Sequence, residues 1–152
     1  MLPTLAGRLQ TRVFATLAIG GIWALLLAPF LPGISGATYA ERFKAQFGLL
    51  VMLTVLGLAW EIIYHGAMQL RWEKDWPTLF GFATLVPEGI VLRLVANRGG
   101  FGDGWWFRYD RDLPTSTFLT AFLTTWIVVW LFVNGPMRIF TVHWRFSGGR
   151  LV

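Results

Sequence analysis

The sequence predicts an all-α integral membrane protein with four transmembrane helices. Hydrophobic residues make up 55% of the 152 residues and charged residues only 14%, whereas soluble domains carry about 25% charged residues. The mean hydropathy is +0.57. The charged residues gather in short clusters between apolar runs, and these runs approach the length of roughly 20 residues that a helix needs to cross the hydrocarbon core.

The first helix is expected at about 13–31, after Arg8 and Arg12. A basic flank before an apolar run also fits a signal peptide. We expect a retained helix, because the run is long for a signal sequence and no clean Ala-x-Ala site follows. Gly20, Ala24 and Ala28 recur every four residues, which predicts a small-residue stripe that lets another helix approach closely.

Three further helices are expected at about 46–66, 77–96 and 117–133, joined by short loops. The third contains Pro87, and an internal proline removes a backbone hydrogen bond, so we expect this helix to be kinked or broken there. In the fourth, Trp126 and Trp130 lie on one face of the predicted helix.

The chain divides into a transmembrane domain over residues 1–136 and a tail over 137–152. Apolar and polar residues alternate in the tail, which predicts an extended or amphipathic interfacial segment. Lys and Arg favour a cytoplasmic position for both termini, because the four predicted spans place seven of them on that side and five on the other. The excess of Arg over Lys fits a GC-rich genome, and we expect a bacterial plasma (inner) membrane protein.

Glu61 and Glu88 are the candidate functional residues, since a carboxylate inside a membrane usually faces a partner, a cavity or a proton path. One hypothesis is a proton or ion relay, with Glu88 as the deep site and Glu61 with His65 at the cytoplasmic mouth. The alternative is structural: Glu61 bonds His65 or Tyr64, and Glu88 bonds a Thr or Trp of a neighbouring helix.

A docking surface is predicted on the same cytoplasmic side, from the loop after the second helix and from the tail. Trp and Arg are over-represented among binding hot spots, although the same residues would also anchor the chain at the membrane boundary. The candidate partner-binding residues are Arg71, Trp72, Trp76, Arg138, Phe140, Trp144, Arg145 and Phe146.

No cofactor, metal or catalytic site is expected. The chain has no cysteine, which excludes disulfides, thiolate metal sites and cysteine nucleophiles. The two histidines, His65 and His143, could hold a haem, but no further ligand accompanies them at a recognisable spacing. The basic residues form no single stripe, so nucleic acid is not an expected partner despite the net charge of +5.

Three functions remain open from the sequence. We expect a non-enzymatic accessory or assembly subunit of a larger membrane complex, with the bilayer and other membrane subunits, or further copies of the chain, as its partners. A proton- or ion-coupled transport component using Glu88 and Glu61 is the first alternative. A haem-binding electron-transfer subunit is the second.

Overall fold

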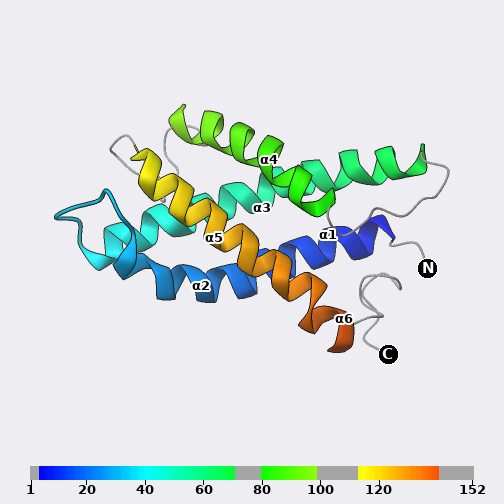
Figure 1. The fold of residues 1–152 in the computed structure, drawn as a ribbon, viewed down its shortest axis with the longest axis horizontal. Coiled ribbons are helices and arrows are strands. Elements are labelled where there is room, and N and C mark those ends of the chain that lie inside the picture. The colour runs from blue at the N-terminus through cyan, green and yellow to red at the C-terminus, as the bar shows by residue number, and fades with distance from the viewer. Residues whose placement is uncertain (1–3, 71–79, 99–112, 141–152) are drawn as a thin grey trace.

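The described residues form helices of different lengths that are joined by turns (Figure 1). The computed structural model describes residues 4–70, 80–98 and 113–140, without the side chains of 80, 81, 138 and 140. Three of its helices are long and apolar enough to cross a membrane, namely Leu5–Phe30, Tyr39–Gln69 and Thr115–Asn134. The predicted all-helical class is thus confirmed for the described residues, together with three membrane-compatible helices.

The first long helix combines α1 (Leu5–Phe14), a π-helical turn η1 (Ala15–Ile19), α2 (Gly20–Leu27) and a 3-10 turn η2 (Ala28–Phe30). It begins eight residues before the predicted start at 13, because Thr4 caps it by accepting a hydrogen bond from the Gly7 backbone N–H at 3.1 Å.

The second long helix, α3 (Tyr39–Gln69), also begins earlier than predicted. Thr38 and Glu41 form a capping box, in which each side chain accepts a hydrogen bond from the backbone N–H of the other residue. Residues 39–45, predicted to be loop, are therefore the first two turns of this helix. Its 31 residues give it a length of about 46 Å, which exceeds the hydrocarbon core of roughly 30 Å.

The third predicted helix is α4 (Phe80–Asn97), which runs without interruption through Pro87. It is shorter than the other three, and it is not among the three helices that, within the described residues, are long and apolar enough to cross a membrane. The expected break at Pro87 is absent, while a kink stays a prediction.

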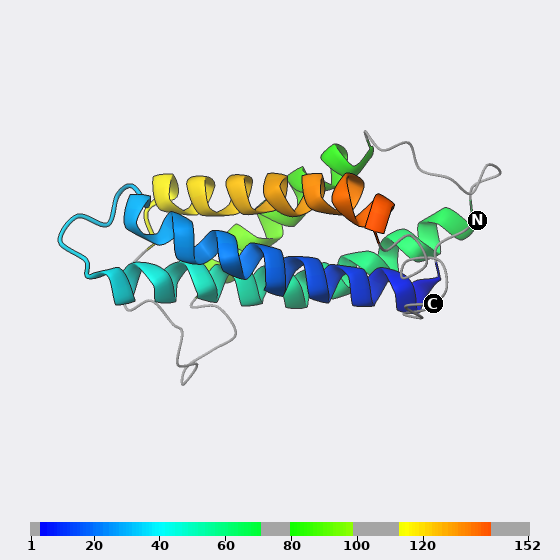
Figure 2. The same ribbon diagram turned by 90° about the horizontal axis from the view of Figure 1, so that it is seen from below.

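The last long helix is α5 (Thr115–Asn134), and α6 (Pro136–Phe140) follows it directly. The predicted tail thus starts as a short helix, not as an extended segment, and its alternating part at 141–152 lies outside the described residues. The start of α1, the end of α3 and α6 lie at one end of the bundle, and the turn between η2 and α3 lies at the other (Figures 1 and 2).

The long helices pack around one apolar core in which α3, α4 and α5 meet. Phe82 of α4 lies 4.5 Å from Trp130 and 5.7 Å from Trp126, ring centre to ring centre. The two tryptophans stack at 6.4 Å, as their predicted common face requires. The buried core residues are Leu31, Leu49, Met52, Leu53, Leu92, Phe118, Ala121, Phe122 and Trp126.

Candidate functional site

Two ion pairs join the first helix to α3 and α4. The Arg8 guanidinium donates from Nε to Glu61 Oε2 of α3 at 2.7 Å, and its Nη2 lies at the same distance from that oxygen. One turn further along the first helix, Arg12 Nη2 donates to Glu88 Oε2 of α4 at 2.6 Å. We call these four residues the arginine–glutamate cluster.

The cluster is electrically neutral and largely shielded. The side chain of Glu88 is 3% exposed and that of its partner Arg12 is 14% exposed, whereas Glu61 is 19% exposed. Arg12 also interacts electrostatically with Glu61, so the two pairs form one network and not two separate contacts. Removing one charge from such a network would leave an opposite charge shielded and uncompensated.

Gly57 of α3 makes the Arg12–Glu88 pair possible. A Cβ atom on Gly57 would overlap Arg12 Nε and would lie 2.7 Å from its Nη2. The guanidinium therefore lies directly against the α3 backbone on its way from α1 to α4. A residue with a side chain at position 57 would occupy this space.

The register between the first helix and α3 explains why the arginines reach this place. Gly20 lies beside Leu50, since a Cβ atom on Gly20 would be 2.6 Å from Leu50 Cδ1. Two turns earlier, Arg12 lies beside Gly57, as an antiparallel pair of helices requires. One face of the first helix thus carries, at every fourth position, Arg8, Arg12, Thr16, Gly20, Ala24 and Ala28.

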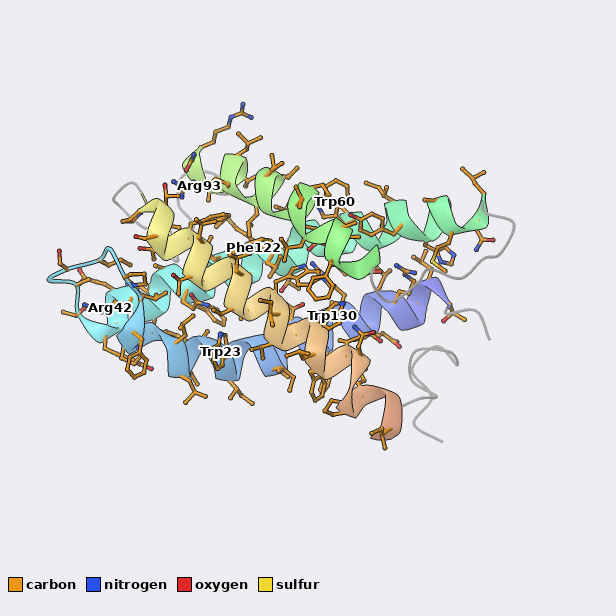
Figure 3. All side chains as sticks on the ribbon, in the orientation of Figure 1. Trp23, Arg42, Trp60, Arg93, Phe122 and Trp130 are labelled. Carbon is orange, nitrogen blue, oxygen red and sulfur yellow. The ribbon has the colours of Figure 1, made fainter. Side chains whose placement is uncertain are left out.

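The three small residues of this stripe lie at a close helix contact, as predicted. Gly20 is buried, and Ala24 and Ala28 are fully buried. α5 closes over the same region, where Trp23 Nε1 donates to Thr124 Oγ1 at 3.0 Å and Gln46 Nε2 of α3 donates to Thr125 Oγ1 at 3.0 Å (Figure 3). These hydrogen bonds between helices fix α5 against its neighbours where the backbones approach closely.

At the opposite end of the bundle, two arginines bind backbone carbonyls instead of carboxylates. Arg93 of α4 donates to the Leu113 carbonyl at 3.0 Å and to Thr115 Oγ1 at 3.2 Å, and it covers the Phe118 ring at 5.1 Å (Figure 3). Arg42 of α3 donates to the Pro29 carbonyl at 3.0 Å. Both side chains tie helix ends to neighbouring segments and have no carboxylate partner within the described residues.

The structure brings Glu61 and Glu88 into one network, but not with the partners that the sequence suggested. Arg8, not His65 or Tyr64, is the ion-pair partner of Glu61, and Arg12, not a Thr or Trp, is that of Glu88. The buried Nδ1 atom of His65 has no hydrogen-bond partner. This atom therefore makes no contact that would support the predicted role of His65 at the mouth of a relay.

Most predicted partner-binding residues lie outside the described residues: Arg71, Trp72, Trp76, Trp144, Arg145 and Phe146. Arg138 and Phe140 belong to α6, but their side chains are not described. His143 also lies outside the described residues, so the haem hypothesis through His65 and His143 stays a prediction.

The residues that the sequence reasoning missed are Arg8, Arg12 and Gly57. The two arginines were assigned to the membrane boundary, as determinants of orientation. Their spacing of four, continuous with the stripe at Gly20, was the available signal, because it places both on the face that packs against α3.

Over the described residues, these observations define an all-helical fold with three membrane-compatible helices and two shielded ion pairs between helices. Within the described residues, no group of three or more His, Cys, Asp or Glu could hold a metal ion. No protein-family model, no curated protein and no solved structure matches the chain.

Proposed function

We propose that this chain is a non-catalytic accessory or assembly subunit of a larger complex in a bacterial plasma membrane. The observation that carries the proposal is the pairing of Glu61 and Glu88 with Arg8 and Arg12. Charged groups inside a membrane usually mark a transport path or hold helices together. Here each carboxylate is already occupied by a guanidinium, which favours the second role.

The proposed membrane arrangement has four spans. α4 has 18 residues and a length of about 27 Å, which is near the thickness of the hydrocarbon core. Its one fully shielded charge, Glu88, is neutralised by Arg12, so crossing the membrane does not require an unpaired carboxylate. With four spans, α1 starts and α5 ends on the same side, and the Lys and Arg distribution favours the cytoplasm for that side.

The proposed docking face is the cytoplasmic end of the bundle. α3 ends at Gln69, immediately before the aromatic and basic loop that contains Trp72 and Trp76, and α6 leads into the tail. Both described helix ends lie at the same end of the molecule (Figure 2). A partner bound there would meet the loop and the tail together.

A relay needs a carboxylate that binds and releases a proton or a cation. Each carboxylate of the arginine–glutamate cluster would first have to leave its arginine, and that would leave a shielded guanidinium without its counter-charge. The pairing therefore weighs against the transport alternative.

The test is a purification in gentle detergent of the full chain and of a variant that lacks residues 137–152. We expect defined membrane partners to copurify with the full chain and to be lost on truncation. A full chain that purifies alone or as a homo-oligomer, regardless of the tail, would contradict the proposal. The control for intact folding is the thermal transition of both proteins, which should agree.

A second variant distinguishes the accessory-subunit proposal from the relay alternative. Exchanging the charges, Arg12→Glu with Glu88→Arg, keeps an ion pair between the same helices. A structural pair tolerates this exchange, so partners should still copurify. Proton flux into proteoliposomes that is present in the unaltered chain and lost in the exchange variant would favour the relay and contradict our proposal.

A further inference from the structure

We infer that α4 is a conditional membrane segment, which the bilayer accepts only while Arg12 of the first helix neutralises Glu88. The inference rests on the four-span arrangement proposed above. It does not depend on which partner the protein binds.

The first step concerns the apolar character of α4. α4 has 18 residues, near the lower limit of about 17–25 residues that cross the hydrocarbon core. Pro87 and Glu88 lie together in its middle, and both weaken insertion: the proline removes a backbone hydrogen bond, and the carboxylate is costly in hydrocarbon.

The second step concerns the source of the compensating charge. Glu88 is 3% exposed, and Arg12 is its ion-pair partner at 2.6 Å. Arg12 comes from the first helix, 76 positions earlier in the chain. An isolated α4 therefore lacks the group that makes its own insertion favourable.

The third step concerns the path of the Arg12 side chain. The guanidinium reaches α4 across α3, through the space that Gly57 leaves open. The first helix and α3 must thus be packed in register before Glu88 can be neutralised. The neutralisation of Glu88 therefore also depends on the pairing of the first helix with α3.

The fourth step is that the other ion pair cannot replace this one. Arg8 is engaged by Glu61 on α3, and its Nη1 lies 2.7 Å from Met68 Sδ, also on α3. Arg93 of α4 is bonded to Leu113 and Thr115 near the opposite end of the helix. The neutralisation of Glu88 therefore depends on Arg12 alone among the described arginines.

The experiment uses the absence of cysteine from the chain. A reporter cysteine replaces Ile90, which is 57% exposed on α4, and a second protein carries one in place of Ile127, which is 41% exposed on α5. Both are expected to face lipid. Each full chain is reconstituted in vesicles and reacted with a water-soluble, membrane-impermeant maleimide added to both sides.

In the otherwise unaltered chain we expect both reporters to be protected. Arg12→Gln should raise the labelling rate at position 90 about tenfold or more, because Glu88 is left unpaired, and should leave position 127 protected. Arg8→Gln is the matched control, and in this variant we expect both positions to stay protected from labelling. Arg12→Gln combined with Glu88→Gln should restore protection at position 90, because α4 then carries no charge in its middle.

Three results would overturn the inference. The first is protection of position 90 in Arg12→Gln. The second is equal exposure of positions 90 and 127, which would mean that the whole bundle, not α4 alone, depends on Arg12. The third is labelling of position 90 in the unaltered chain, which would remove α4 from the membrane and with it the four-span arrangement, while the partner purification described above would still test the accessory role.

Discussion

Glu61 and Glu88 carry the same charge, but their burial predicts different energetic roles. Glu88 is almost fully shielded, whereas Glu61 is 19% exposed. Replacing Glu88 by Gln should lower the free energy of unfolding by about 3–5 kcal/mol, because Arg12 is left shielded and unpaired. Glu61→Gln should cost about 1–3 kcal/mol, because Glu61 is the more exposed carboxylate and its partner Arg8, although only 10% exposed, lies one turn nearer the start of the first helix than Arg12. Unfolding in mixed micelles with increasing SDS measures both, and equal losses would contradict the ranking.

Gly57 offers a second prediction for a single residue. Gly57→Ala places a methyl group on the Arg12 guanidinium and should lower the free energy of unfolding by about 1–3 kcal/mol. Gly66→Ala is the matched control on the same helix, because a Cβ atom there has no neighbour within 4 Å.

In a helix, Ala is favoured over Gly by about 1 kcal/mol, so Gly66→Ala should be neutral or stabilising. The same unfolding assay compares the two variants. Equal effects would show that Gly57 has no special relation to Arg12.

For the helices as elements, the close approach of α2 to α3 and α5 is the feature to test. Gly20→Ala would bring a Cβ atom to 2.6 Å from Leu50 Cδ1 and 3.4 Å from Thr125 Cγ2, whereas Gly21 has nothing within 4 Å of such an atom. We expect Gly20→Ala to lower the thermal transition, at a cost of about 1–3 kcal/mol. Gly21→Ala should leave it unchanged or raise it. A reversed order would mean that α2 packs through another face.

Helix starts are the part of the elements that the sequence reasoning placed least well, although the signals were local. Thr38 with Glu41 three positions later is a capping-box pattern. The prediction from apolar length alone places the start of α3 at 46, seven residues after the start at Tyr39. Thr4 caps α1 with its side chain alone, without a returning carboxylate. Apolar length shows where a helix crosses the membrane, but caps show where it begins.

At the scale of the whole molecule, the proposed orientation predicts which end of the bundle faces the cytoplasm. Ser35 lies in the exposed turn before α3, and Gln69 lies exposed at the end of α3. Ser35→Cys in intact cells should react with an impermeant maleimide, whereas Gln69→Cys should react only after the membrane is opened. The opposite pattern would place the termini outside the cell.

Several features could be predicted without coordinates, because they depend on composition and periodicity. The membrane class follows from apolar runs of sufficient length. The small-residue stripe from Gly20 to Ala28 and the common face of Trp126 and Trp130 follow from helical spacing alone. The structure confirms the last two features, since the stripe is buried and the two indoles stack, and it contains three helices that are long and apolar enough to cross a membrane.

Only the tertiary structure decided what Glu61 and Glu88 bind. The sequence contains several arginines and two carboxylates within apolar segments, and no local rule assigns one to another across 53 or 76 positions. The antiparallel register of the first helix and α3, with Gly57 leaving room beside it, brings Arg8 to Glu61 and Arg12 to Glu88. Helix spacing determines which residues share a face, but the packing of separate helices determines which charges meet.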